Sequence, residues 1–361
     1  MNHFLRISLF FFFAISVVSC NKTDNIGPVP LRDYTTQYNA DIAKIEEFLQ
    51  TRSYTVLNHP GFADDQDVTF TQIPDGDTSM TSIWNSGNLL VHIYHDYSHD
   101  IDYKIYYLKF RDGGGAANDK PSPTNVDGVL AGYSGSYMFS AAKDTTAGPT
   151  TSVTRLKTHT FESNPFPQAV LSLESAIRGW SEIFPQFKAG DFTSVSGEPT
   201  AYSDFGAGVL FVPSGLGYYN QSQSAIPAYS PLIFSFKLFE VTRLDQDQDG
   251  IPSYLEDLNG DGYIHVIPEG FDNPDDTDGD LAPDYLDLDD DADLVLTKVE
   301  TRRPKLNPDD PNEEYTNYPF NGAAIDDPLT PNIDETKGVP DCSGDFFTPT
   351  RLRKYRDPGC H

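Results

Sequence analysis

Apolar residues recur at two different spacings along the chain, and each spacing predicts a different element. From Leu232 to Leu238 every second residue is large and apolar, which predicts a β-strand with one buried face. From Ile101 to Arg111 a similar alternation predicts a second strand. From Glu174 to Phe187 the apolar residues are spaced by three and four, which predicts a short helix. We therefore expect an α+β fold in which a helix packs on an antiparallel sheet.

The chain before Ile101 is predicted to contain one helix and a turn-rich region. Apolar residues at helical spacing predict a helix from Tyr38 to Thr51. Residues 52–100 hold short apolar runs between Asp-, Gly- and Pro-containing turns, which indicates short strands or a small N-terminal module. Several histidines and acids in this region suggest either a metal site or solvated edge-strand residues, and the lack of Cys favours the second interpretation. These residues are His92, His95, Asp96, His99 and Asp100.

Three stretches in the middle of the chain are predicted to be loops. Phe139 to Thr160 and Asp191 to Gly208 are rich in Thr, Ser, Gly and Pro, so both are predicted to be loop insertions. Gly113 to Asn118 is Gly-rich but is not a phosphate cradle, because no Lys-Ser/Thr pair follows it.

Residues 1–19 have the pattern of a targeting segment. Arg6 precedes an apolar run from Ile7 to Val18 that is too short to span a bilayer comfortably. The run ends in Val17-Val18-Ser19-Cys20, which resembles the lipobox of bacterial lipoproteins. The resemblance implies lipid attachment at Cys20 and anchoring to a membrane of the bacterial cell envelope. An ordinary signal peptide with an incidental Cys is the alternative.

Length and charge limit the classes of partner. The 361 residues allow two or three domains and a core large enough to fold unaided. The formal net charge of −29 opposes binding to nucleic acid and to anionic membrane surfaces. We therefore expect no nucleic-acid partner.

An acidic stretch follows Val241. Eighteen acidic side chains and no Lys or Arg occur from Asp245 to Asp293. A disordered acidic tail is one explanation, but the spacing favours another. The segment from Asp245 to Glu256 has the pattern D-x-D-x-D-G-I-x-S-x-x-E, which fits the twelve-position calcium loop. Ca²⁺ suits oxygen ligands on an irregular chain better than Mg²⁺, which requires near-octahedral geometry.

Three further frames follow this first loop. The frame at Asp257 keeps the front half of the pattern, and the frames at Asp276 and Asp289 lack Gly at position six. The series resembles bacterial thrombospondin type-3-like calcium repeats, which implies a chain that wraps a row of structural Ca²⁺ ions with little apolar core. The predicted ligands are Asp245, Asp247, Asp249, Ile251, Ser253, Glu256, Asp257, Asn259, Asp261, Asp276, Asp278, Asp280, Asp284, Asp287, Asp289, Asp291, Asp293 and Glu300.

The last sixty residues are rich in Pro and Asn and are predicted to form an extended segment that packs on its neighbours. Cys342 and Cys360 are the only cysteines besides Cys20. In an exported protein we expect these two to pair, which would contribute roughly 3 kcal/mol by closing a loop of about nineteen residues. Two thiols with only His361 nearby argue against a zinc site.

The middle of the chain carries a series of short motifs. In order, they are Tyr133 two residues before Gly135, Phe161-Glu162-Ser163, Ile177-Arg-Gly-Trp180, Pro213-Ser-Gly-Leu216-Gly-Tyr218, Ile226-Pro227 and Leu232-Ile233-Phe234. This order resembles the FKBP family of peptidyl-prolyl cis-trans isomerases, and the resemblance extends over roughly residues 103–241.

This resemblance implies an antiparallel half-barrel sheet wrapped on a short helix, with a pocket that binds a proline ring. Trp180 is implied to form the pocket floor, and Tyr218 is implied to bond a substrate carbonyl. The other implied site residues are Tyr133, Phe161, Ile177 and Phe234 in the walls, Ile226 at the rim, and Glu162 facing the twisted amide. The alternative is that these aromatic residues only fill the core of a half-barrel.

The chain departs from the family pattern at three places. Glu162 stands where the family usually has Asp, one methylene shorter. The second wall aromatic aligns with either Phe166 or Leu171. Tyr219 replaces a common Gly, which predicts a crowded pocket mouth.

Two functions are consistent with this sequence. Rotation about an X–Pro bond faces a barrier of roughly 18–20 kcal/mol and needs no nucleophile or general base, only a dry pocket that favours the twisted amide. The first interpretation is therefore a prolyl isomerase that acts on proline-containing polypeptides in the cell envelope. The second is a non-catalytic FKBP-fold module that binds a partner in a calcium-stabilised surface assembly.

The predicted regions are residues 1–19 (signal), 20–100 (tether and N-terminal module), 101–242 (isomerase-like), 243–300 (calcium repeats) and 301–361 (extended segment).

Overall fold

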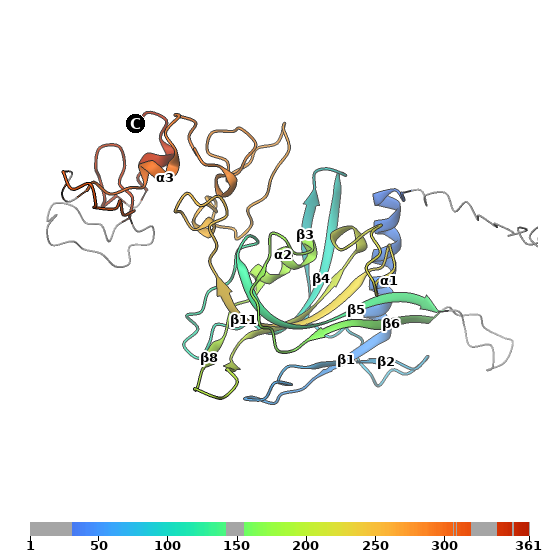
Figure 1. Ribbon diagram of the computed structural model, residues 1–361. Coiled ribbons are helices and arrows are strands. Elements are labelled where there is room, and N and C mark those ends of the chain that lie inside the picture. Colours follow the sequence, from blue (N-terminus) through green and yellow to red (C-terminus); the bar gives the residue numbers. More distant parts are fainter. Residues whose placement is uncertain are drawn as a thin grey trace, which may run out of the picture. The chain divides into compact units, whose positions relative to one another are not determined.

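The computed structural model describes residues 31–141, 155–305, 307, 309–318, 338–348 and 350–360 (Figure 1). The predicted targeting segment and Cys20 lie outside these residues. Asp33–His361 forms one compact unit. Within the described ranges, no helix combines the length and the apolar character needed to cross a membrane.

A seven-stranded antiparallel sheet forms the centre of this unit, and the predicted α+β fold class is confirmed. The main path runs β3-β4-β10-β11-β5-β6, and β7 pairs with β5. The strands are β3 (Leu89–Asp96), β4 (Ile101–Arg111), β5 (Gly128–Ala141), β6 (Arg155–Asn164), β7 (Leu171–Ser172), β10 (Gly206–Val212) and β11 (Leu232–Thr242). The strand predicted at Ile101–Arg111 is β4 and is confirmed.

Alternation along the central strands gives this sheet two apolar faces. On β10, Leu210 and Val212 join the cluster around Trp180, whereas Val209 and Phe211 join the cluster on the opposite face. The short helix α2 (Arg178–Ile183) lies on the first face, inside the curve of the sheet (Figure 1). It continues as the 3₁₀ turn η2 (Phe184–Gln186).

The second face is covered by the N-terminal residues. Helix α1 (Tyr34–Thr51) begins at Asp33, whose side chain accepts a hydrogen bond from Thr36 N at 2.8 Å. The helix buries Ile45, Phe48 and Leu49 in this cluster, and the hairpin of β1 (Arg52–Val56) and β2 (Val68–Gln72) packs beside it.

The predicted boundary at residue 100 is corrected by the pairing of β3. This strand pairs with β4 from Leu89↔Leu108 to Asp96↔Ile101, so it belongs to the main sheet. Of the two predictions for residues 52–100, short strands are confirmed, and a separate N-terminal module is not.

The helix predicted from Glu174 to Phe187 is shorter in the structure. Ile177 is extended, with φ −62° and ψ 143°, so α2 begins only at Arg178. Pro185 has no N–H to continue an α-helical hydrogen-bond ladder, and the chain tightens into η2 there.

Both predicted loop insertions contain strand residues. β5 extends to Ala141 and pairs with β6, which begins at Arg155, so both ends of the first insertion belong to paired strands. Residues 142–154 lie outside the described part of the chain. In the second insertion, β8 (Asp191–Thr193) pairs with β9 (Ala201–Ser203), and β10 begins at Gly206. Gly113 to Asn118 is a loop, as predicted.

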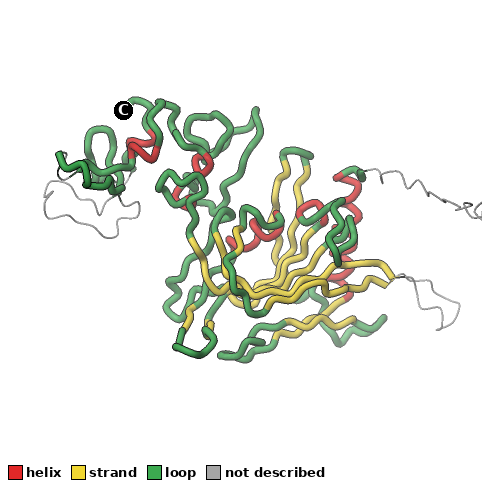
Figure 2. The backbone as a smooth tube through the Cα atoms, in the orientation of Figure 1, coloured by secondary structure: helices red, strands yellow, loops and turns green. Residues whose placement is uncertain are grey.

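The described residues after Thr242 are mostly loops and turns (Figure 2). Their short helical elements are η4 (Ser253–Leu255), η5 (Asp284–Leu286), α3 (Thr297–Glu300) and η7 (Lys354–Arg356). A small apolar cluster of Ile251, Tyr318, Val339, Phe346 and Tyr355 joins the first acidic loop to the C-terminal segment. Cys342 and Cys360 form a disulfide within that segment, with Cα atoms 5.3 Å apart.

Candidate functional site

Aromatic rings from α2 and three strands meet on the face of the sheet that α2 covers. Trp180, on α2, is 5% exposed and meets Tyr133 and Phe234 edge to face, with ring centroids 5.0 Å and 5.3 Å away. Phe161 on β6 meets Phe234 at 5.7 Å, also edge to face. This geometry is favourable for aromatic quadrupoles and encloses an apolar surface around the Trp180 indole.

The indole of Trp180 has an unusual feature. Its Nε1 is buried and has no hydrogen-bond partner among the described residues. A buried N–H that lacks a partner costs free energy and calls for an explanation. A carbonyl group bound in this pocket would satisfy that donor.

Two tyrosine hydroxyls of this cluster lie near one carboxylate. Tyr133 Oη donates a hydrogen bond to Glu162 Oε1 at 2.8 Å. Burial, this bond and the Glu162 charge raise the pKa of Tyr133. Burial and the same carboxylate raise the pKa of Tyr218, so both phenols stay protonated at neutral pH and can donate hydrogen bonds.

The structure brings all eight residues implied by the FKBP resemblance to one place. Seven of them belong to a single apolar cluster, and Glu162 joins it through Tyr133. The seven are Tyr133, Phe161, Ile177, Trp180, Tyr218, Ile226 and Phe234.

Two glycines permit this close packing. A Cβ on Gly135 would lie 2.5 Å from Phe161 Cζ and 2.8 Å from Phe234 Cε1. A Cβ on Gly179 would lie 2.5 Å from Val212 Cγ1, so this Gly lets α2 approach β10. The pocket walls and the seat of α2 therefore both depend on missing side chains.

The turn that precedes Tyr218 is held by the N-terminal helix. Asp41 on α1 is fully buried and accepts hydrogen bonds from Ser214 N at 2.9 Å, from the Ser214 hydroxyl and from Gln37 Nε2. Ser214 begins the 3₁₀ turn η3 (Ser214–Leu216). The helix predicted at the N-terminus is thus part of the framework that supports the pocket.

Two of the departures from the FKBP pattern, at Tyr219 and at the second wall aromatic, can be compared with the structure. Tyr219 does not crowd the pocket mouth, because its φ of 47° turns the ring onto Tyr34 at 4.1 Å and towards Tyr229 at 5.1 Å. Leu171 packs against the pocket cluster, whereas Phe166 is 65% exposed and belongs elsewhere.

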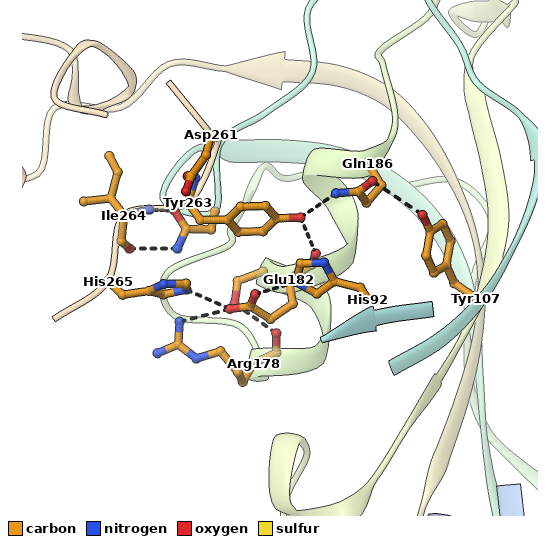
Figure 3. Close-up of polar contacts among 11 residues, drawn as sticks. His92, Tyr107, Arg178, Glu182, Gln186, Asp261, Tyr263, Ile264 and His265 are labelled. Carbon is orange, nitrogen blue, oxygen red and sulfur yellow. Dashed lines mark hydrogen bonds and ion pairs between the residues drawn. The ribbon is translucent and has the colours of Figure 1, made fainter. Parts of the chain in front are cut away.

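A buried carboxylate two residues after Trp180 links the pocket to the acidic loops. Glu182 is 1% exposed, and its two oxygens lie 3.1 Å from His92 Nε2 and 2.9 Å from His265 Nε2 (Figure 3). Burial alone raises the pKa of this carboxyl, but the bonds with His265 and His92 and the charges of His265 and Arg178 outweigh burial. The pKa of Glu182 is therefore lower than usual.

A tyrosine strengthens the same connection. Tyr263 Oη donates to the backbone oxygen of Glu182 at 2.9 Å and accepts from Gln186 Nε2 at 2.7 Å (Figure 3). On the other side of this loop, the Asn125 amide donates to Ile264 O and accepts from Ile264 N, each at 2.8 Å. The second acidic loop is therefore bonded directly to α2 and to the loop before β5. No sequence pattern indicated Glu182, because its two partners lie about 80–90 positions away.

The four acidic frames share one backbone geometry. In each loop the N–H at position six donates to the position-one carboxylate at 2.7–3.2 Å. The N–H at position seven donates to the position-five carboxylate at 2.6–2.8 Å. The spacing of the acids thus predicted four loops correctly, including those that lack part of the pattern.

The absence of Gly at position six does not change this geometry. Gly250 and Gly262 have φ of 104° and 88° at this position, and Leu281 and Leu294 adopt φ of 83° and 75° there. A residue with a Cβ pays about 1–2 kcal/mol for this conformation. The two leucine loops therefore carry strain that the two glycine loops avoid.

The carboxylates gather into compact groups. Three groups come from single loops, and a fourth combines residues of two loops; in each, the ligand atoms lie within 4.8 Å of one another. The groups are Asp245/Asp247/Asp249, Asp276/Asp278/Asp280, Asp289/Asp291/Asp293 and Asp249/Glu256/Asp290.

Several of these oxygens are buried and have no hydrogen-bond partner in the described chain. Both oxygens of Glu256, Asp290 and Glu300 are in this condition. Burial, followed by repulsion from neighbouring carboxylates, raises the pKa of Glu256 to about 11 and that of Asp290 to about 9. Oxygen-only donors that are buried, unpaired and mutually repelling fit a hard cation such as Ca²⁺.

Two predicted ligands also form hydrogen bonds within their own loops. The Ser253 hydroxyl bonds the side chain and backbone N of Gln246, and Asp284 accepts from Thr277 N and Oγ1, each at 2.7 Å. In the first, third and fourth loops the position-nine side chain thus accepts a hydrogen bond from the position-two N–H of the same loop, which we call the position-two clip. In the second loop Asp275, which the pattern did not indicate, accepts from Leu258 N instead.

His92 and His95 on β3, and His99 in the turn after it, each lie beside a carboxylate. His92 binds Glu182, whereas His95 Nδ1 pairs with Asp102 and His99 Nδ1 with Asp96, each at 2.8 Å. No group of three metal-ligating side chains in the described residues includes them. β3 is the outer strand of the sheet, so His92 and His95 lie on an edge strand.

A cavity of about 880 Å³ is lined by residues outside the aromatic cluster. It includes Phe62, Leu130, Phe166, Tyr202 and Phe239 in its lining and shares no residue with the eight implied ones.

Comparison with known proteins gave partial likenesses. A family model described as BamM C-terminal matches residues 246–332. A search of curated proteins found no match.

Among solved structures, a peptidyl-prolyl cis-trans isomerase from Pseudomonas syringae pv. tomato is 18% identical, with a TM-score of 0.26, and the match covers 42% of this chain and 81% of that one. FkpA from Escherichia coli is 20% identical, with a TM-score of 0.26, and the match covers 42% of this chain and 51% of that one. The N-terminal domain of FKBP42 from Arabidopsis thaliana is 12% identical, with a TM-score of 0.26, and the match covers 42% and 91%.

Proposed function

We propose that the chain is a peptidyl-prolyl cis-trans isomerase that acts on proline-containing polypeptides. The observation that carries this proposal is the enclosed aromatic cluster around Trp180, with a buried indole N–H that has no partner within the described residues. The order of the FKBP-like motifs supports the same function.

Catalysis of this rotation requires a site that holds the twisted amide better than the planar one. The planar amide is stabilised by resonance, and twisting it costs roughly 18–20 kcal/mol in water. An apolar pocket removes water from the amide and receives the proline ring. Tyr218 Oη and Trp180 Nε1 supply donors at the rim and floor, and Glu162 holds the Tyr133 hydroxyl in place.

Isomerisation of a short X-Pro-Phe peptide tests this proposal directly. We expect the mature protein to accelerate the reaction, and Trp180→Leu and Tyr218→Phe to lose most of that acceleration. Trp84→Phe and Tyr315→Phe are matched controls, since both side chains are exposed and outside the cluster. A folded wild-type protein that binds the peptide without acceleration would support the alternative of a non-catalytic binding module.

The acidic loops carry a second proposed function, the binding of structural Ca²⁺. The buried, unpaired oxygens of Glu256 and Glu300 support it. The residues that would hold the ions are the position-one, -three and -five carboxylates together with these two glutamates, and the bound ions would neutralise their repulsion. Calcium that binds only the folded state at about 100 times its Kd stabilises by about 2.7 kcal/mol per site. Chelation should therefore lower the Tm markedly, and an identical melt in chelator would contradict the proposal.

The location is also part of the proposal. The lipobox-like pattern supports an envelope protein anchored through lipid on Cys20, and the BamM C-terminal match agrees with an envelope setting and with an assembly partner. Metabolic labelling with a fatty-acid analogue tests the anchor: label should be lost in Cys20→Ser. Label retained in that variant would refute the anchor.

A further inference from the structure

One buried acid outside the predicted ligand positions has no hydrogen-bond partner for its carboxylate in the described chain. Asp290 occupies position two of the fourth loop, between Asp289 and Asp291. Its carboxylate does not join those neighbours but groups with Asp249 and Glu256 of the first loop, with all ligand atoms within 4.8 Å of one another. Asp290 and Glu256 are 34 positions apart in the sequence.

This group has no internal charge compensation. Asp249 is fully buried, and Glu256 and Asp290 are each 1% exposed. No hydrogen-bond donor in the described chain reaches either oxygen of Glu256 or Asp290. Three carboxylates so close together and out of water repel strongly, and burial of unpaired charge is unfavourable, so a bound cation would stabilise the arrangement.

The orientation of Asp290 is set by its own loop. Its backbone N donates to Thr297 Oγ1 at 3.1 Å, the same position-two clip that the first and third loops use. The clip fixes the backbone at Asp290, while the side chain lies with the first loop. The other three loops have Gln246, Leu258 and Thr277 at position two, so an acid occurs there only in the fourth loop.

We propose that Asp290 is a ligand of the ion held by the first loop, so that one Ca²⁺ joins the first and fourth loops. This inference rests on the proposed calcium function and adds a ligand from outside the first loop. Asp245, Asp247 and Asp249 supply the local ligands, Glu256 closes the loop, and Asp290 completes the shell from the other end of the acidic stretch. Oxygen-only donors on irregular chain suit the seven-coordination of Ca²⁺.

The ion would then act as a cross-link within the acidic stretch. Positions one to five can bind an ion whether or not the stretch is folded back on itself, because they are close in sequence. A site that needs Asp290 forms only when the two loops are docked. Calcium binding at this site is therefore coupled to closure of the stretch, whereas the Asp289/Asp291/Asp293 group depends on its own loop.

The test uses the full mature chain with Ca²⁺ as the probe. Native mass spectrometry counts bound ions, and titration gives their affinities, for Asp290→Asn, Glu256→Gln and the control Asp272→Asn, an exposed acid in the same stretch. We expect Asp290→Asn and Glu256→Gln each to lose one ion, or to weaken one site about tenfold or more, and the double variant to lose no second ion. The control should bind as the wild type does.

Melting temperature supplies a second, independent measurement. Without metal, Asp290→Asn relieves the cost of burying an unpaired acid beside Asp249 and Glu256, and should raise Tm above that of the wild type. In Ca²⁺ it removes a ligand and should lower Tm. A merely structural role would change Tm in the same direction in both conditions and would overturn the inference, as would an unchanged ion count and affinity in Asp290→Asn. A wild-type chain that binds no calcium would refute the calcium function itself, which distinguishes that failure from the failure of this inference.

Discussion

Glu182 offers the most direct test of how the aromatic pocket is supported. The perturbation is Glu182→Ala, which removes a carboxylate that is 1% exposed and lies between His92 Nε2 at 3.1 Å and His265 Nε2 at 2.9 Å. The substitution leaves two half-buried imidazoles without their acceptor and frees the second acidic loop from one of its bonds to α2.

The expected loss follows from the burial of this network. Removal of one partner from a buried, hydrogen-bonded charge cluster costs about 3–5 kcal/mol. In a protein of this size 1 kcal/mol shifts Tm by about 1.4 °C, because the unfolding entropy is about 2.1 cal/mol/K per residue, so Tm should fall by ~4–7 °C. Glu182→Gln keeps one acceptor oxygen and should lose less. Glu198→Ala, an exposed Glu in the β8–β9 hairpin, should change stability by no more than ~0.5 kcal/mol.

The pH dependence gives the sign of the effect. Because the pKa of Glu182 is lower in the folded state, its carboxylate contributes stability above the ordinary Glu pKa of about 4.3, and this contribution disappears as pH falls through the folded pKa. The Tm difference between wild type and Glu182→Ala should therefore be full at pH 6–7 and shrink below about pH 4. Circular dichroism melts across this range measure it. Equal melts at pH 7, or a difference that grows on acidification, would refute the reasoning.

Three further substitutions test the pocket, the loops and the C-terminal segment. Gly135→Ala places a methyl group against two pocket rings and should abolish peptide isomerisation while costing about 1–3 kcal/mol of stability in a urea melt; normal activity would contradict the proposed pocket. Leu294→Gly should stabilise the calcium-loaded protein by about 1 kcal/mol, because Leu294 is 92% exposed and has φ of 75°, whereas Leu288→Gly at an ordinary φ should destabilise it. If Leu294→Gly and Leu288→Gly both lowered the stability, the strain assigned to position six would be contradicted. Cys342→Ser should lower the free energy of unfolding in urea by about 3 kcal/mol. A reductant should cause the same loss in the wild type, which contains the disulfide, and should not change the stability of the variant.

Much of the candidate site followed from patterns that are local in the sequence. The period of two from Ile101 to Arg111 placed β4 correctly, because each strand residue faces the side opposite its neighbour. The spacing of Asp245, Asp247 and Asp249 predicted an acidic loop, because the backbone bonds that shape it join residues two to five positions apart. Leu281 and Leu294 show that this local pattern imposes its turn even against the preference of the residue.

The remaining features depend on residues that only the folded chain brings together. Glu182 meets His92 and His265 from about 80–90 positions away, and Asp290 meets Glu256 from 34, so no spacing rule relates them. The extent of the sheet was also decided at this level, since β3 joined it by pairing with β4 and thereby removed the predicted boundary at residue 100. Hydrogen bonds between near neighbours leave their period in the sequence. The burial of a charge depends on which surfaces pack against it, and that is set by the tertiary structure alone.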